Sequence, residues 1–215
     1  MANMYERLLG DIYKNLHPEL QKRYAITEEN SFTGEGKMDE IYGGSFFVKF
    51  ILKIASRFRM FFSERGEEIP FTIQNTAERD EYGQELVRWN RTFYFHNKKR
   101  YFNAVMQLDE KENEIVDYFG EPHLLVSTLH FHIDELGAMH ISSKKQWFYM
   151  FGRKIPLPKF LLHHTKIPLP KFLYGEAKIV ESYDDELQCF RIHVQVRNPL
   201  IGSLFSYKGT FVERK

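Results

Sequence analysis

The chain has a single cysteine, Cys189, among its 215 residues, so an intramolecular disulfide cannot form. A chain of this length buries about 70% of its unfolded surface and folds without disulfides or metals. It also lacks an apolar run long enough to span a membrane, and charges interrupt the N-terminal stretch where a secretory signal needs an apolar core. These absences favour a soluble, cytoplasmic protein with Cys189 as a buried structural thiol.

A surplus of charge of either sign is missing as well, because 30 basic residues face 29 acidic ones. Binding of nucleic acid through the overall field needs a basic surplus, so we expect no nucleic-acid partner. No glycine-rich phosphate loop, serine elbow or Cys-x-x-Cys pair occurs either. The sequence therefore indicates no reaction type and no cofactor, and it leans against an enzyme.

Aromatic residues, by contrast, make up 16% of the chain and suit half-buried strands. Residues 1–65 are expected to be a mainly helical cover that contains one glycine-rich extended stretch, "FTGEGKMDEIYGG". From residue 66 to 215 apolar residues alternate between polar turns. We expect a single α+β domain, mostly antiparallel β: an up-and-down meander of about eight strands, curled into a barrel or half-barrel and covered by the N-terminal helices.

The alternation also predicts which strand residues pair. A four-residue turn after Phe95 pairs Phe93 with Phe102, and a similar turn near the C-terminus pairs Ile179 with Ile192. These pairings place alternate apolar residues on an inner face and polar ones on an outer face.

Several polar or aromatic residues fall on that inner face: Trp89, Arg91, Glu181, Tyr207 and, if Leu108 pairs with Ile115, Asp117. Because a buried charge needs a partner, we expect Arg91 to pair with Glu181 or Asp117. One interpretation is an ion pair that fixes the strand register. The other is a site where Arg91 anchors the acidic head group of a small amphipathic ligand. An enzyme that uses Arg91 with Glu181 or Asp117 on a bound acid or phosphate is a further alternative.

Three potential metal ligands alternate along "HFHID", namely His130, His132 and Asp134. On a strand they share one face, a spacing compatible with zinc or iron. Phe131 and the other apolar residues between them are the natural core face, so we expect the histidines to face solvent.

The segment Phe46 to Phe62, "FFVKFILKIASRFRMFF", is the most amphipathic part of the chain. Its narrow polar strip of Lys49, Lys53, Ser56 and Arg57 leaves a wide apolar stripe on a helix. We favour a helix buried against the sheet; the alternative is a helix that lies on a membrane surface or contacts a partner protein.

Short motifs along the chain resemble those of an uncharacterised bacterial domain family. They are "YERLLG", "FTGEGKM", "IPFTIQN", "VRWNRTF", "IVDYFG", one "LPKFL"-type segment and "NPLIGSLFSYKGTF". That family has no established activity, and it is found alone or fused C-terminally to saccharopine-dehydrogenase-like NAD(P)-binding proteins. The resemblance therefore implies a redox-enzyme partner. The family's Trp-x-Arg-x-Phe motif falls on Trp89, Arg91 and Phe93, and its Tyr-x-Gly motif falls on Tyr207 and Gly209.

The segment 154–177 contains the octamer "KIPLPKFL" twice, at 154–161 and 166–173. A tandem duplication or an engineered insertion explains such identity, and two copies are too few for a solenoid. The copies start 12 residues apart, an even number that preserves inward and outward strand faces. We expect one copy to occupy the family's single segment and the other to form an exposed loop, a local extension or a segment swapped between molecules.

Overall fold

The computed structural model describes residues 2–149, 166–168 and 174–214. The chain begins with α1 (Met4–Leu9), the 3-10 helix η1 (Gly10–Asn15) and α2 (Pro18–Tyr24). After the first strand come α3 (Phe46–Ala55) and the 3-10 turn η2 (Ser56–Phe58). The strands are β1 (Phe32–Tyr42), β2 (Gly66–Arg79), β3 (Glu85–Phe95), β4 (Lys98–Tyr101), β5 (Ala104–Asp109), β6 (Glu114–Phe119), β7 (Leu125–Ile133), β8 (Met139–Tyr149), β9 (Lys166–Pro168), β10 (Glu176–Asp184), β11 (Cys189–Asn198) and β12 (Gly202–Glu213).

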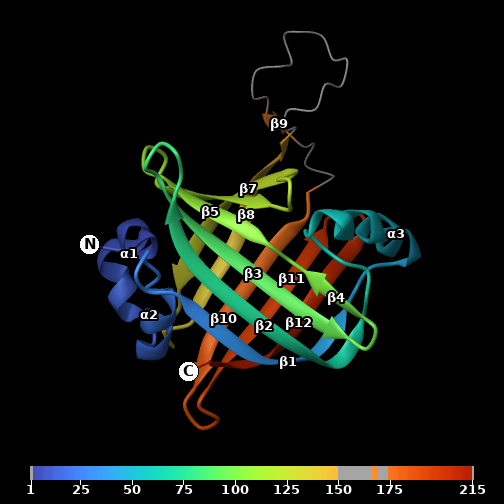
Figure 1. The fold of residues 1–215 in the computed structure, drawn as a ribbon, viewed down its shortest axis with the longest axis horizontal. Coiled ribbons are helices and arrows are strands. Elements are labelled where there is room, and N and C mark those ends of the chain that lie inside the picture. Colours follow the sequence, from blue (N-terminus) through green and yellow to red (C-terminus); the bar gives the residue numbers. More distant parts are fainter. Residues whose placement is uncertain (1, 150–165, 169–173, 215) are drawn as a thin grey trace.

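Within the described residues the strands form one 12-stranded sheet that closes on itself (Figure 1). In the part of the chain that the structure describes, β4 pairs with β3 and β9 pairs with β8, and the other strands form the ring. Each strand of the ring pairs antiparallel with the next one along the chain, β8 pairs directly with β10, and β1 pairs with β12. The predicted up-and-down antiparallel meander is confirmed, but it is a closed barrel of ten strands, so neither the half-barrel nor the estimate of eight strands holds.

Two glycines allow the first and last strands to join. A Cβ added at Gly36 would lie 2.1 Å from the carbonyl oxygen of Thr210, and one at Gly209 would lie 2.2 Å from that of Lys37. Any larger residue at either position would push β1 and β12 apart. The glycine-rich stretch therefore forms β1, with the close backbone approach that its composition predicts.

Helical segments close the two ends of the barrel (Figure 1). At one end Asn3 caps α1 by accepting hydrogen bonds from the backbone N–H groups of Tyr5 and Glu6. Tyr5 then enters the barrel, where its hydroxyl accepts a hydrogen bond from Trp89 Nε1 at 2.9 Å. At the other end, near α3, Phe62 packs against Phe93 and Phe205 at ring-centroid distances of 4.8 and 4.9 Å.

The predicted registers of two hairpins are wrong by two residues, although their inner and outer faces are right. Phe93 pairs with Arg100 rather than with Phe102, because the β3–β4 turn contains two residues and not four. Ile179 pairs with Val194 rather than with Ile192. Because side chains alternate with a period of two, a shift of two residues keeps each side chain on its predicted face.

Candidate functional site

The predicted inner-face residues all lie inside the barrel, each at most 2% exposed: Trp89, Arg91, Asp117, Glu181 and Tyr207. Asp117 is among them because Leu108 pairs with Ile115, as predicted. Arg91 and Asp117 line one narrow cavity together with Trp89, whereas Glu181 lies in a separate cluster.

Glu181 binds an arginine that the sequence interpretation did not consider. Arg23 of α2 donates hydrogen bonds from Nε and Nη2 to the two oxygens of Glu181 at 2.9 and 3.0 Å. The hydroxyl of Tyr24 donates to Glu181 at 3.0 Å, and Arg23 Nη1 donates to Asn75 at 2.9 Å. The predicted pairing of Arg91 with Glu181 is therefore wrong. The Arg23–Glu181 ion pair instead connects α2 to β10 inside this end of the barrel.

Arg91 is held by uncharged groups. Its Nε donates to the carbonyl oxygen of Phe102 at 2.9 Å, and its Nη1 donates to the Tyr207 hydroxyl at 3.4 Å. The guanidinium carbon lies 4.0 Å from the centroid of the Phe102 ring, a cation–π contact. Among the described residues, no carboxylate forms an ion pair with Arg91.

Asp117, on β6, is the other charged group of this cavity. Its Oδ1 is buried and has no hydrogen-bond partner among the described residues. Burial raises the pKa of Asp117 to about 7, and the attraction of Arg91 offsets this only in part. The carboxyl group therefore titrates near neutral pH.

The cavity that these two residues line has a volume of about 30 Å³. Its other walls are mainly apolar and include Phe102 and Phe119. Sites for small organic ligands occupy roughly 300–1,000 Å³. The cavity has room for one or two water-sized groups, not for an amphipathic ligand.

The histidine face lies on the outside of the barrel. His130 and His132 are exposed, as expected. The carboxylate of Asp134 accepts a hydrogen bond from Nε2 of His140 at 2.8 Å. In the part of the chain that the structure describes, no three His, Cys, Asp or Glu side chains are placed to hold a metal ion. The strand spacing of His130, His132 and Asp134 does not converge into a metal centre there.

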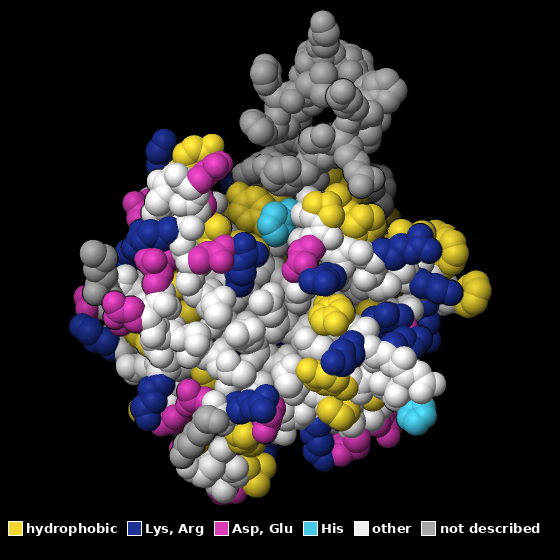
Figure 2. All heavy atoms as spheres, viewed as in Figure 1, with side chains coloured by type: hydrophobic (Ala, Val, Ile, Leu, Met, Phe, Trp, Pro, Cys, Tyr) yellow, Lys and Arg dark blue, Asp and Glu magenta, His cyan; other side chains and the backbone are white. Residues whose placement is uncertain are grey.

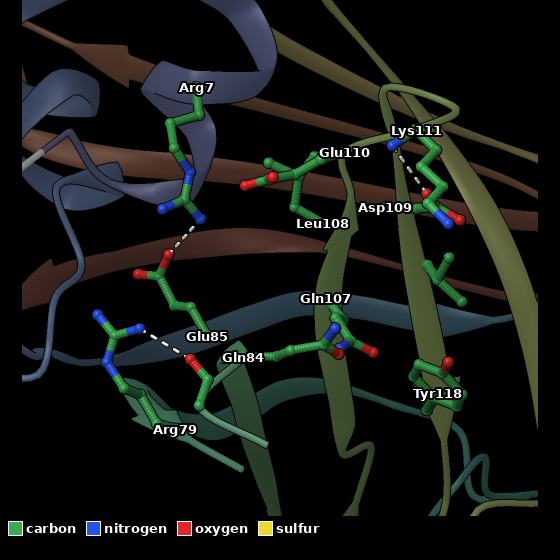
Figure 3. Close-up of a pocket in the computed structure, with 12 residues that line it drawn as sticks. Arg7, Arg79, Gln84, Glu85, Gln107, Leu108, Asp109, Glu110, Lys111 and Tyr118 are labelled. Atoms are coloured by element: carbon green, nitrogen blue, oxygen red, sulfur yellow. Dashed lines mark hydrogen bonds and ion pairs between the residues drawn. The ribbon is translucent and has the colours of Figure 1, made fainter. Parts of the chain in front are cut away.

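A polar hollow of about 560 Å³ lies on the outer surface between α1 and strands β3, β5 and β6 (Figure 3). Arg7 of α1 crosses it to Glu85 at 2.6 Å. Arg79 donates to the carbonyl oxygen of Gly83 at 2.9 Å and also pairs with Glu28. These cations already have protein partners, so the hollow is not our candidate site.

The most unusual surface is that of α3. Phe46, Phe47 and Phe50 are 91%, 65% and 60% exposed, and Ile51 and Ile54 are also exposed. The helix buries mainly Val48 and Leu52. The expectation of a helix buried against the sheet is therefore wrong, because only one narrow edge of the apolar stripe packs on the barrel.

Basic side chains accompany these exposed phenylalanines. Residues 46–62 contain Lys49, Lys53, Arg57 and Arg59 but no acidic residue. A hollow of about 550 Å³ beside α3 is lined by Phe50, Lys53, Ile54, Ser56, Arg57 and Arg100. Figure 2 shows yellow and dark blue side chains gathered over this region at the upper right. Among the described helices, none has the length and apolarity needed to cross a bilayer.

The fold and these surfaces define a closed antiparallel β-barrel with a nearly filled interior and one exposed, basic amphipathic helix. The chain belongs to the family described as Domain of unknown function (DUF4166), whose model matches residues 16–167 and 162–211. The "Uncharacterized protein YndH" of Bacillus subtilis is 46% identical over 215 residues, which is 100% of this chain and 98% of that protein. The resemblance to a family without an assigned activity is confirmed; the fusion to dehydrogenase-like proteins stays a prediction.

Proposed function

We propose that this protein is a peripheral membrane-binding module that attaches to anionic lipid surfaces through α3. The observation that carries the proposal is the exposure of Phe46, Phe47 and Phe50 on a helix whose only charges are positive. Large contiguous apolar patches are uncommon on protein surfaces and mark sites of interaction. An amphipathic helix with this composition lies in the plane of a membrane interface.

The expected energies are sufficient for reversible binding. Full burial of one phenylalanine side chain contributes about 1.5–3 kcal/mol, and each basic residue near an anionic surface adds about 1 kcal/mol. Three phenylalanines together with Lys49 and Lys53 therefore supply both a hydrophobic and an electrostatic term.

Charge complementarity favours a lipid surface over an apolar protein groove. Lys49 and Lys53 are one helical turn apart, and their long side chains can extend their amines to phosphate groups while the phenylalanines enter the acyl region. The α3 helix is only 10 residues long, which suits a position along the interface.

The other hypotheses receive less support from the geometry. A cavity of about 30 Å³ does not favour an interior amphipathic ligand anchored by Arg91. A redox-enzyme partner and an acid–base enzyme built on Arg91 and Asp117 stay predictions.

Vesicle co-sedimentation at low salt tests the proposal. The wild-type protein should sediment with vesicles that contain phosphatidylglycerol and much less with pure phosphatidylcholine. The triple variant Phe46→Ser/Phe47→Ser/Phe50→Ser should lose at least about a hundredfold in affinity, because it removes roughly 4 kcal/mol or more of apolar burial.

The control variant is Leu136→Ser, which removes a side chain that is 88% exposed in the turn between β7 and β8. It should bind like the wild type. Failure of the wild-type protein to bind anionic vesicles, or equal loss in both variants, would overturn the proposal and leave α3 as a contact surface for another protein.

A further inference from the structure

We infer that the cavity lined by Arg91 and Asp117 is a binding site for one small monovalent anion of the size of chloride or formate. This site is inside the barrel and independent of the membrane proposal, which concerns α3. Three features support the site: the balance of buried charge, an unpartnered polar atom and the dimensions of the cavity.

Among the described residues, Arg91 is a buried cation that forms no ion pair with a carboxylate. Arg23 and Glu181 neutralise each other through two hydrogen bonds. Within the described part of the chain, Arg91 contacts the Phe102 carbonyl, the Tyr207 hydroxyl and the rings of Phe102 and Trp89, none of which carries a negative charge. A buried cation without a counterion carries a large free-energy cost, so this cavity attracts negative charge.

Asp117 provides the second contact for an anion. Its side chain is 2% exposed, it lines the same cavity as Arg91, and its Oδ1 has no partner among the described residues. A protonated carboxyl group is a hydrogen-bond donor, whereas an ionised one is only an acceptor. An anion is therefore held between the N–H groups of Arg91 and the O–H group of Asp117.

Of the described groups around Asp117, its own carboxyl group is the one that titrates near neutral pH. Arg91 on β3 is the charged group whose field acts on it, and the Tyr5 hydroxyl from α1 faces it more weakly. Burial raises the pKa of both Asp117, to about 7, and Tyr5, so Tyr5 stays neutral. Across the sheet Asp117 pairs with Met106 of β5 and Ser127 of β7, which carry no charge.

The size of the cavity selects the ligand class. A volume of about 30 Å³ accommodates a single chloride, a formate or a water pair, and it excludes phosphate and acyl amphiphiles. The apolar walls strengthen the attraction between the guanidinium group and an anion, since the local dielectric constant is low.

Thermal unfolding at constant ionic strength tests the inference. At pH 6, replacing sodium gluconate by sodium chloride or formate should raise the melting temperature of the wild-type protein in a saturable manner, by at least about 2 °C. The rise should be smaller at pH 8, where Asp117 is ionised and repels the anion.

Three variants separate this site from binding at the surface. Arg91→Met should lose the anion-dependent rise, whereas Arg88→Met, which changes an outward-facing arginine of the same strand, should keep it. Asp117→Asn keeps a neutral donor and should retain anion binding without its pH dependence.

Bromide provides a direct readout that does not depend on whether Arg91→Met folds. Crystals grown at pH 6 with sodium bromide should show one anomalous-scattering peak between Arg91 and Asp117. A cavity that contains only water under these conditions, or a rise in melting temperature that Arg88→Met also loses, would overturn the inference.

Discussion

Asp117 couples the stability of the barrel to pH. Its pKa is 3.8 for an unperturbed carboxyl group and rises to about 7 in the folded protein because of burial. Between these values the folded state binds a proton that the unfolded state has released. The contribution of Asp117 to the free energy of unfolding is therefore largest below pH 4, and it decreases as the pH rises towards 7.

Asp117→Asn should remove this pH dependence. Relative to the wild type, the variant should gain up to about 4 kcal/mol in free energy of unfolding between pH 4 and pH 8, since one pKa unit corresponds to about 1.4 kcal/mol. Urea unfolding at several pH values measures the difference. The exposed Glu110→Gln is the control; a wild-type–variant difference that is independent of pH would contradict the assignment.

The Arg23–Glu181 pair makes a second prediction at the scale of single residues. Glu181→Gln should destabilise the protein by about 3–5 kcal/mol, because Arg23 is then buried without a counterion. The double variant Arg23→Met/Glu181→Leu should recover most of that loss, since both charges are removed together.

Chemical denaturation of the single and double variants forms a thermodynamic cycle. The exposed pair Arg7–Glu85 provides the comparison, where Arg7→Gln should cost less than about 1 kcal/mol. A double variant as unstable as Glu181→Gln would show that local packing, and not the lone charge, causes the loss.

At the scale of elements, α3 should bind membranes through two separable contributions. Lys49→Ser/Lys53→Ser should weaken binding to anionic vesicles by roughly tenfold or more and reduce its dependence on salt, because about 1 kcal/mol is lost per basic residue. Titration with vesicles at several salt concentrations measures both effects. The distant Lys14→Ser should match the wild type, and an unchanged salt dependence in the double variant would contradict a role for these lysines.

The strands illustrate what alternation can predict. It assigned Trp89, Arg91 and Tyr207 to the inner face, and that assignment survives a register error of two residues. It could not determine turn length, because both a two-residue and a four-residue turn satisfy the same alternation.

The sequence pattern of the helices is ambiguous for a physical reason. A wide apolar stripe on α3 suits burial in a core as well as contact with a membrane, so the pattern alone did not reveal that Phe46 and Phe50 are exposed. The sequence does not reveal the partner of Glu181, because Arg23 is 158 residues away on α2. An arginine in the last turn of a helix is usually exposed to solvent, where it interacts favourably with the helix dipole.

At the scale of the whole molecule, the barrel closes without the octamer segment. Strand β8 pairs directly with β10, with Ser142 opposite Lys178 and Ile141 opposite Ile179. Of the repeated sequence, the structure describes Lys166–Pro168, which form β9 at the outer end of β8. The expectations for the rest of the two copies lie outside the described residues.

Deletion of residues 154–165 should therefore leave a folded barrel whose melting temperature is within about 4 °C of the wild type. Shortening a connection changes the loop-closure entropy only slightly, and the β8–β10 pairs remain available. Circular dichroism and thermal unfolding check this. The variant Gly36→Val, which obstructs the junction of β1 and β12, is a control that should lose cooperative folding; equal loss in the deletion variant would show that both copies are needed.

The junction of β1 and β12 also determines when the barrel can close during translation. Strand β1 ends at Tyr42, and β12 begins at Gly202, roughly 160 residues later in the chain. At translation rates of about 5–20 residues per second, β1 waits on the order of ten to thirty seconds for its partner to be made. During that interval its edge stays open, and pairing with another nascent chain competes with closure of the barrel.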